Sequence, residues 1–213
     1  MSEPDIPQTR SSEARAVNTL VIARHGKPSL SRKVYMTWQG YRDWWIKYDE
    51  GGIVQGQRVP PKLLFWVNQA DLIIASPLKR AVESAELAAG RAVDIVDDHL
   101  VEAALPSPPF GKFKMRPKSW GTAARIFWYF GWSDGLESHS EARARVEIMC
   151  DRLADYATDG KIVYVSAHGW INRMLKGSLI KRGWKMRSQN GDLHWSFRRY
   201  ERPVNYEENN GRK

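Results

Sequence analysis

Cysteine and long apolar runs are both scarce in this sequence. Cys150 is the one cysteine in 213 residues, so no disulfide can form within the chain. No stretch approaches the roughly 18 consecutive apolar residues of a membrane-spanning helix. The first eighteen residues, rich in Ser, Glu, Arg and Pro, lack the apolar run of a signal peptide. These absences predict a cytoplasmic protein with no membrane span.

Acidic residues are outnumbered, and a phosphate-binding loop of the Walker type is missing. The chain has 24 Asp and Glu against 33 Lys and Arg, a formal net charge of +9. A field of this sign attracts anions, whether phosphorylated metabolites, nucleic acid or anionic lipid headgroups. Gly51, Gly52 and Gly56 are not followed by the Gly-Lys-Ser/Thr start of a P-loop helix, which argues against an NTPase. The charge therefore predicts an anionic partner without choosing among these classes.

Length and composition favour a single domain. A hydrophobic content of 42% over 213 residues is sufficient for a sizeable core. We assign the domain to residues 19–200 and expect disordered tails at residues 1–18 and 201–213. Cys150 falls on the apolar stripe of a helix expected at residues 146–157, so packing explains it better than reactivity.

Three short apolar runs indicate buried strands. Residues 19–23, 71–75 and 162–165 are rich in Val, Ile and Leu, as is typical of strands buried on both faces. A polar turn and a helical pattern follow each run. After the second run, Ser76 is expected to cap a helix whose first residue is Pro77. Strands that alternate with helices predict an α/β fold, a three-layer αβα sandwich with a mostly parallel central sheet.

Weaker patterns complete the expected fold. Further helices are expected at residues 41–48, at 146–157 and from Pro60 or Pro61, and further strands at 91–96 and 193–197. The segment 104–118, dense in Pro, Phe and Lys, has no clear period and is expected to be a loop or lid. Together with the aromatic stretch after it, this segment forms a predicted cap over residues 104–132.

Polar residues that suit phosphate chemistry follow each buried strand. Arg24 and His25 follow the first strand, Arg80 lies early in the helix after the second, and His168 follows the third. The carboxyl ends of parallel strands open onto the same edge of a sheet, so these four side chains are expected to converge. Guanidinium groups match phosphoryl oxygens, and a positioned imidazole can attack phosphorus. Taken together, the strand ends predict a phosphoryl-transfer site.

These residues also carry a resemblance to a known family, in three motifs that span roughly residues 20–200. The motifs are Arg24-His25-Gly26, then Ser76-Pro77-Leu78 with Arg80-Ala81, and finally Ser166-Ala167-His168-Gly169. Their order and context resemble the histidine phosphatase superfamily, the phosphoglycerate mutase-like group. The resemblance implies that His25 becomes a phosphohistidine, while Arg24, Arg80 and His168 hold the phosphoryl oxygens.

A proton donor is also implied by the resemblance. The family uses a Glu or Asp on a loop after the third strand, and Glu102 fits that place. Asp97 and Asp98 lie close by and stay as alternatives. Glu83, three residues after Arg80, could pair with that arginine and support it.

Two departures from the mutase pattern limit what the resemblance implies. Mutases of this family continue Arg-His-Gly with Glu and place Asn six residues after the histidine, whereas Lys27 and Ser31 stand here. Hydrolysis is therefore favoured over mutase-type phosphoryl transfer, with Ser31 as a candidate phosphate ligand in place of the Asn. Lys27 adds a cation near the pocket, which hints at a substrate with more than one negative group.

Three other interpretations compete. His25, His168 and Glu102 have the donor types of a metal site, but two neighbouring arginines would repel the cation. A catalytically inactive scaffold is a second possibility. The third is a nucleic-acid or polyanion-binding module, carried by a basic run interleaved with aromatic residues: Lys112, Phe113, Lys114, Arg116, Lys118 and Trp120. The favoured prediction is hydrolysis of a small phosphorylated substrate through a phosphohistidine, without metal or organic cofactor and without nucleic acid.

Overall fold

The computed structural model describes residues 15–206. Most of the two tails expected to be disordered therefore lies outside the described residues. At the described ends, the first strand begins at Val17 and the last strand ends at Pro203. Strand pairing thus extends a few residues beyond the domain limits inferred from the sequence.

A six-stranded sheet forms the middle of the molecule, in the order β3-β2-β4-β1-β6-β5. The strands are β1 (Val17–Arg24), β2 (Leu72–Ala75), β3 (Ile95–Val96), β4 (Ile162–Ala167), β5 (Lys185–Gln189) and β6 (Phe197–Pro203). β1 pairs in parallel with β4, β4 with β2, and β2 with β3. β6 is antiparallel to both of its neighbours, β1 and β5. The prediction of a mostly parallel sheet is confirmed.

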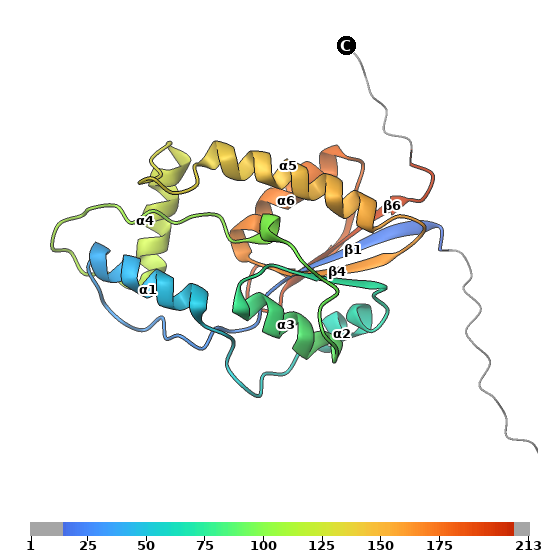
Figure 1. The fold of residues 1–213 in the computed structure, drawn as a ribbon, viewed down its shortest axis with the longest axis horizontal. Helices are drawn as coiled ribbons and strands as arrows, with labels where there is room; N and C mark the ends of the chain where they lie inside the picture. Colours follow the sequence, from blue (N-terminus) through green and yellow to red (C-terminus); the bar gives the residue numbers. More distant parts are fainter. Residues whose placement is uncertain (1–14, 207–213) are drawn as a thin grey trace, which may run out of the picture.

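Helices cover both faces of this sheet and one of its ends. They are α1 (Trp38–Glu50), α2 (Pro61–Val67), α3 (Lys79–Ala89), α4 (Pro117–Tyr129), α5 (His139–Tyr156) and α6 (Gly169–Lys181), with a 3-10 turn, η1, at Asp98–Leu100. Figure 1 shows α5 and α6 on one side of the sheet, α2 and α3 on the other, and α1 with α4 beyond one end. The three-layer αβα architecture is confirmed. None of the helices within residues 15–206 is long and apolar enough to cross a bilayer.

Alternating side chains of the central strands build two separate cores. Leu20 and Ile22 of β1 pack into the core beneath α5 and α6, whereas Val21 and Ala23 pack into the core beneath α2 and α3. Successive strand residues point to opposite faces, so a strand covered on both sides must be apolar throughout. This is why the first apolar run could be recognised from the sequence.

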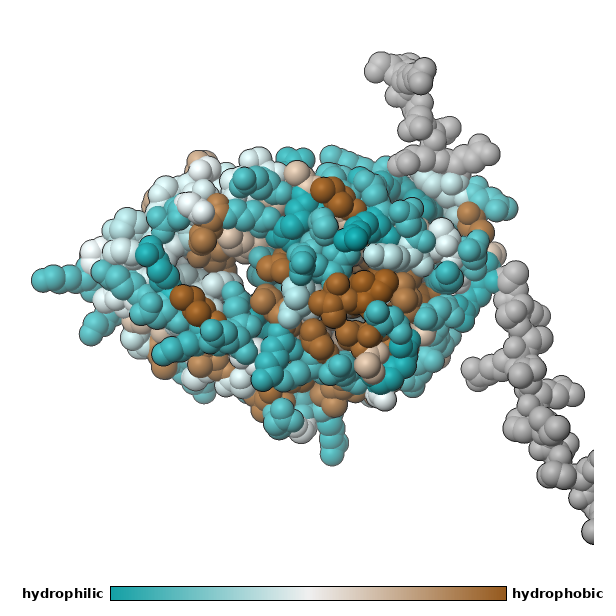
Figure 2. Space-filling model, viewed as in Figure 1, coloured by the Kyte–Doolittle hydropathy of each residue, from teal (hydrophilic) through white to brown (hydrophobic). Residues whose placement is uncertain are grey.

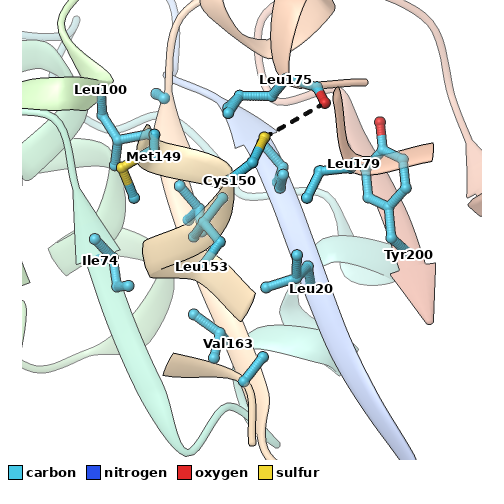
Figure 3. Close-up of a cluster of buried hydrophobic side chains, with 14 of the residues drawn as sticks. Leu20, Ile74, Leu100, Met149, Cys150, Leu153, Val163, Leu175, Leu179 and Tyr200 are labelled. Atoms are coloured by element: carbon cyan, nitrogen blue, oxygen red, sulfur yellow. Dashed lines mark hydrogen bonds between the residues drawn. The ribbon is translucent and has the colours of Figure 1, made fainter. Parts of the chain in front are cut away.

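Cys150 lies in the core between α5 and the sheet. Its side chain is fully buried beside Leu153, Leu175 and Tyr200, as Figure 3 shows. Burial raises the pKa of this thiol to about 12, and its Sγ lies 3.9 Å from the carbonyl oxygen of Leu175. The prediction that Cys150 serves packing is confirmed.

The predicted start of α3 was wrong. The helix begins at Lys79 with Leu78 as N-cap, and Ser76 does not cap it. The Ser76 hydroxyl instead lies 2.7 Å from Nε2 of His168. A serine that precedes a helix can cap it or can bind a more distant side chain. Here Ser76 binds His168, which directly follows the neighbouring strand β4.

Two predicted strands were longer than those observed. The strand expected at residues 91–96 is reduced to Ile95–Val96, because the Asp94 carboxylate turns back to accept the N–H of Ile73. The strand expected at 193–197 begins only at Phe197, since Trp195 has a φ of 62° and lies in a turn. Within the predicted cap, residues 117–129 form α4, so the loop expected at 104–118 ends just before Pro117.

The face seen in Figure 1 is mostly hydrophilic, with a hydrophobic patch near its centre (Figure 2). Most apolar side chains of α5 are buried against the sheet, but not all of them. Leu153 is fully buried, whereas Ile148 on the same helix is 50% exposed.

Replacing Leu153 by Ala should therefore lower the free energy of unfolding by about 3 kcal/mol, because the change leaves a cavity between α5 and the sheet. Ile148→Ala, the matched control on the exposed side, should change it by less than about 0.5 kcal/mol. Urea denaturation followed by circular dichroism measures both. Equal losses in the two variants would contradict the packing described for α5.

Candidate active site

The position of His25 is set by two adjacent parallel strands. Arg24, the last residue of β1, is in register with Ala167, the last residue of β4. The N–H of His25 donates to the carbonyl oxygen of Ala167 at 3.0 Å. His25 and His168 consequently follow neighbouring strand ends, and their ring centroids lie 5.2 Å apart.

A pocket of about 470 Å³ opens at these strand ends. Arg24, His25, Arg80 and Glu102 all line it, and further walls come from α1, α4 and the first turn of α6. His168 is fully buried beside His25 without lining the pocket itself. The structure thus brings together the residues that the three motifs single out.

His25 is held as a neutral imidazole with one free nitrogen. Its Nδ1 lies 2.7 Å from the carbonyl oxygen of Gly26. A carbonyl can only accept, so Nδ1 carries the proton and Nε2 keeps its lone pair. Burial, together with His168, Arg80 and Arg24, holds the pKa of His25 well below its ordinary value. An unprotonated Nε2 is the state in which an imidazole can act as a nucleophile.

Gly26 allows the turn that follows His25 to pack closely. Its N–H donates to the Ser84 hydroxyl at 2.7 Å, and that hydroxyl donates to the carbonyl oxygen of Arg80 at 2.6 Å. A Cβ at Gly26 would lie 2.6 Å from the ring of Trp195. Any larger residue would therefore push the turn away from the loop before β6.

His168 is a second neutral histidine beside the first. Its Nε2 is hydrogen-bonded to the Ser76 hydroxyl, and its Nδ1 has no partner within residues 15–206. Burial, then the charges of Arg80 and Arg24, hold the pKa of His168 well below its ordinary value. A neutral ring with one uncommitted nitrogen can offer a hydrogen bond to a bound group.

Two arginines supply positive charge next to these rings. Arg24 donates from Nη1 to the carbonyl oxygen of Asp192 at 2.7 Å, and burial lowers its pKa. Arg80 is 1% exposed. Its Nη1 lies 2.9 Å from Oδ1 of Asp49, and its guanidinium stacks over the ring of Tyr48.

The supporting carboxylate of Arg80 differs from the one that the sequence suggested. Glu83 accepts the N–H of Ile53 at 2.7 Å and lies 3.9 Å from Nζ of Lys79. Asp49, at the end of α1, takes the place beside Arg80. Spacing along one helix suggested Glu83, but the partner comes from another element that no local pattern connects to Arg80.

Glu102 is fixed at the amino end of α6. Its Oε2 accepts the N–H of Trp170 at 3.1 Å, and its Oε1 accepts those of Ile171 at 3.0 Å and Ala103 at 3.1 Å. The amino end of a helix offers unpaired N–H groups and a positive potential, both of which bind a carboxylate. The carboxyl group is thereby held in the pocket that contains His25.

The two alternative acids lie elsewhere. Asp97 is buried in contacts with Arg152, at 2.7 Å, and with His99, at 2.9 Å. Asp98 is exposed and does not line the pocket. Of the three acids considered from the sequence, Glu102 is the one that the structure places in the pocket.

The backbone around Glu102 is anchored by two arginines that sequence reasoning missed. Arg145 of α5 donates to the carbonyl oxygens of His99 and Val101 at 2.6 and 2.9 Å. Arg125 of α4 donates to those of Ala103 and Ala104, both at 3.1 Å. Arg125 is also stacked against Trp128 and Trp170, and burial lowers its pKa to about 10. Hydrogen bonds from an arginine side chain to distant backbone carbonyls produce no pattern of spacing in the sequence.

Ser31 and Lys27 do not line the pocket that contains His25. Ser31 is exposed, its hydroxyl accepts the N–H of Lys33 at 3.2 Å, and it does not line the pocket. Its neighbour Arg32 does. Lys27 is exposed and pairs through its backbone with Gln57. Among the Lys and Arg residues of the basic run at residues 112–118, only Lys118 lines the pocket.

His194 is a third histidine at the site, and the sequence analysis did not single it out. Its ring centroid lies 5.5 Å from that of His25, from the turn before β6. Burial and the nearby charges of Arg24, Arg32 and Lys27 lower its pKa to about 4. It appeared in the sequence only as a polar residue in an alternating stretch, so no signal marked it.

Comparison with known families assigns the protein to a class. The sequence model of the histidine phosphatase superfamily (branch 1) matches residues 20–203. Because this match spans most of the chain, the protein belongs to the histidine phosphatase superfamily. The resemblance seen in the three motifs is confirmed.

Several solved structures are similar to this one. A putative alpha-ribazole-5'-P phosphatase from Escherichia coli is 18% identical, with 76% of this chain and 79% of that chain covered and a TM-score of 0.50. The protein named mycobacterial hydrolase 1 is 21% identical, covering 78% and 82%, with a TM-score of 0.49. The ecdysone phosphate phosphatase of Bombix mori is 20% identical, covering 83% and 81%, with a TM-score of 0.48.

At this identity, the likeness to the Escherichia coli structure shows the shared fold alone. No curated protein sequence matches the chain.

Arg145→Met should lower the free energy of unfolding by about 2 to 4 kcal/mol, because it leaves two backbone carbonyls and the Glu137 carboxylate without their donor. Arg143→Met, on an exposed position of the same helix, should change it by less than about 0.5 kcal/mol. Urea denaturation of both variants measures the difference. A loss for Arg145→Met no larger than for Arg143→Met would contradict the anchoring of the Glu102 loop.

The buried histidines predict how stability depends on pH. The folded pKa values of His25, His168 and His194 all lie below the ordinary value near 6.5. Below that pH the unfolded chain binds more protons than the folded one, so the free energy of unfolding should fall as the pH is lowered from 6.5 to 5. The slope contributed by each histidine is at most about 1.4 kcal/mol per pH unit.

Urea denaturation at pH 8, 7, 6 and 5 checks this dependence. The curve should be flat between pH 7 and 8, where the three rings are neutral in both states, and His194→Gln should show a shallower fall below pH 6.5. A flat wild-type curve down to pH 5 would show that these rings are not buried as neutral groups.

Proposed function

We propose that this protein is a phosphatase that hydrolyses a phosphomonoester through a phosphohistidine at His25. The observation that carries the proposal is the neutral His25, whose Nε2 is free in a pocket lined by Arg24 and Arg80. The cations favour a bound phosphoryl group, and the free nitrogen can attack it.

In the first step, Nε2 of His25 attacks phosphorus while the bond from phosphorus to the leaving oxygen breaks. Protonated Glu102 gives its proton to that oxygen, so an alcohol leaves. Arg24 and Arg80 stabilise the charge that spreads over the phosphoryl oxygens in the transition state. His168, whose Nε2 is engaged with Ser76, offers Nδ1–H to one of these oxygens.

In the second step, water replaces His25 on phosphorus. Glu102, now a carboxylate, takes a proton from the water as its oxygen bonds to phosphorus and the bond to Nε2 breaks. Phosphate and the starting forms of His25 and Glu102 result, so the cycle needs no further reactant. We propose that no metal takes part, because Arg24 and Arg80 already provide the positive charge and would repel a cation.

Mutase-type transfer to a second alcohol is the alternative within the same family. The departures at Lys27 and Ser31 favour hydrolysis, since neither residue lines the pocket beside His25. The structurally similar Escherichia coli protein is itself described as a phosphatase. A phosphatase is also the simpler activity for this site, because water is always present as the acceptor.

Phosphate release from para-nitrophenyl phosphate by EDTA-treated protein tests the proposal. Wild type should be active after chelation, and His25→Ala should lose at least about 10³-fold in kcat. His139→Gln removes a histidine that does not line the pocket and should keep full activity. Rapid-quench mass spectrometry should find one phosphoryl group on wild type and none on His25→Ala. Activity that survives in His25→Ala would overturn the mechanism.

Hydrolysis rates of two esters with different leaving groups test the role of Glu102 as proton donor. In Glu102→Gln, hydrolysis of an alkyl phosphate should fall by about 10² to 10⁴-fold, because the alkoxide needs a proton. Hydrolysis of para-nitrophenyl phosphate in the first step should fall far less, since nitrophenolate leaves without one. An equal loss in the rate of the first step for both esters would show that Glu102 is not the proton donor.

A further inference from the structure

The pocket extends well beyond the atoms that react. Its volume is about 470 Å³, whereas one water molecule occupies about 30 Å³ in the liquid. A phosphate group with its four oxygens therefore fills only part of it. The remainder lies between α1, α4 and the start of α6, and it must accommodate the leaving group of the substrate.

Aromatic rings form the wall of this outer part. Tyr41, Trp45 and Tyr48 of α1 and Trp170 of α6 line it. The rings of α1 are fixed by one another and by Trp120 of α4, with centroids between 4.9 and 6.1 Å apart. A rigid apolar wall of this kind suits a flat or ring-bearing group.

Two buried polar groups on the wall lack partners. Tyr41 is fully buried, and its hydroxyl has no hydrogen-bond partner within residues 15–206, although it faces α4 at Gly121. The indole N–H of Trp170 is likewise without a partner in the described chain. A buried donor left unpaired is costly, so groups of this kind in a pocket point to a ligand that carries an acceptor.

The mouth of the pocket carries a surplus of positive charge. Besides Arg24 and Arg80, the lining includes Arg32, Lys118, Arg125 and Arg173, while Glu102 is its one acid. Arg125 is committed to backbone carbonyls and Arg173 to the Asp192 carboxylate. Arg32 and Lys118 form no ion pair with any described residue, and Arg32 is held over the ring of Tyr48 at 5.5 Å.

The amino end of α4 adds to this charge. Pro117 and Lys118 occupy its first turn and line the pocket. No acidic residue lies in that turn, and no side chain caps the helix. The helix end and the two unpaired cations thus favour an anion at the mouth.

We infer that the substrate is a phosphomonoester whose leaving group bears an apolar ring and a second negative charge, which Arg32 and Lys118 bind at the mouth of the pocket. The inference rests on the proposed phosphatase function. The ring packs against the α1 wall, and the Tyr41 hydroxyl donates to an acceptor on the leaving group. Because Arg32 and Lys118 are exposed, the gain is about tenfold in kcat/KM and is screened by salt.

Two esters of the same shape isolate the second charge: 4-carboxyphenyl phosphate and the neutral 4-carbamoylphenyl phosphate. Wild type should prefer the carboxyl ester by about tenfold in kcat/KM at low ionic strength, and the preference should shrink as salt is added. The double variant Arg32→Gln/Lys118→Gln should lose the preference, measured as the ratio of kcat/KM for the two esters.

The matched control is Lys112→Gln/Lys114→Gln, which removes the same charge from exposed lysines that do not line the pocket. It should keep the preference of wild type. Equal kcat/KM for the two esters in wild type, or an equal loss of preference in the control, would overturn the inference. Failure of wild type to hydrolyse either ester, or hydrolysis by His25→Ala, would instead count against the phosphatase function itself.

Tyr41→Phe tests the hydrogen bond on the wall. It should lower kcat/KM for the carboxyl and carbamoyl esters by about 3 to 10-fold and leave phenyl phosphate, which has no acceptor there, unchanged. Tyr200→Phe also removes a buried hydroxyl without a partner in the described chain, but from the core drawn in Figure 3. It should alter none of the three rates. A loss on phenyl phosphate as large as on the other esters would show that Tyr41 acts through packing alone.

Discussion

The pairing of β1 with β4 is the constraint on which the rest of the site depends. Their register sets Arg24 beside Ala167, so the next residue on each strand is a histidine, and the His25 N–H closes the pair on the Ala167 carbonyl. A slip of one residue would turn every side chain of a strand to the other face. It would exchange the residues that face the two cores, and the packing of these cores therefore also fixes the positions of the two rings.

This placement has an electrostatic consequence. The rings of His25 and His168 lie 5.2 Å apart, centroid to centroid, and burial with the charges of Arg80 and Arg24 holds both pKa values well below the ordinary value. The arginines remain charged and are compensated nearby, Arg80 by Asp49 and Arg24 by the Asp192 carbonyl. The same surroundings thus leave a lone pair on His25 and a positive potential for an anion, two properties that a single exposed histidine could not combine.

The two parts of the pocket come from different parts of the fold. The strand ends and the amino ends of α3 and α6 surround His25, whereas α1 and α4 form the outer wall. Arg125 links the two parts, since it packs against Trp128 on α4 and also holds the carbonyls next to Glu102. A change in the outer wall that moved α4 would accordingly be felt at the carboxyl group as well.

Local chemistry explains which features could be derived from the sequence. Strands buried on both faces must be apolar throughout, and residues that directly follow parallel strands must meet at one edge, so the sheet and the positions of Arg24, His25, Arg80 and His168 followed from short segments. Partners from distant elements had no such signal. Asp49 beside Arg80, the anchoring of the Glu102 loop by Arg145 and Arg125, and the approach of His194 to His25 join residues more than 20 positions apart. The fold class and the four residues at the strand ends could thus be predicted from the sequence. Only the folded chain shows which side chains hold those residues in place and which line the rest of the pocket, because such contacts depend on how helices and loops pack rather than on any period along the chain.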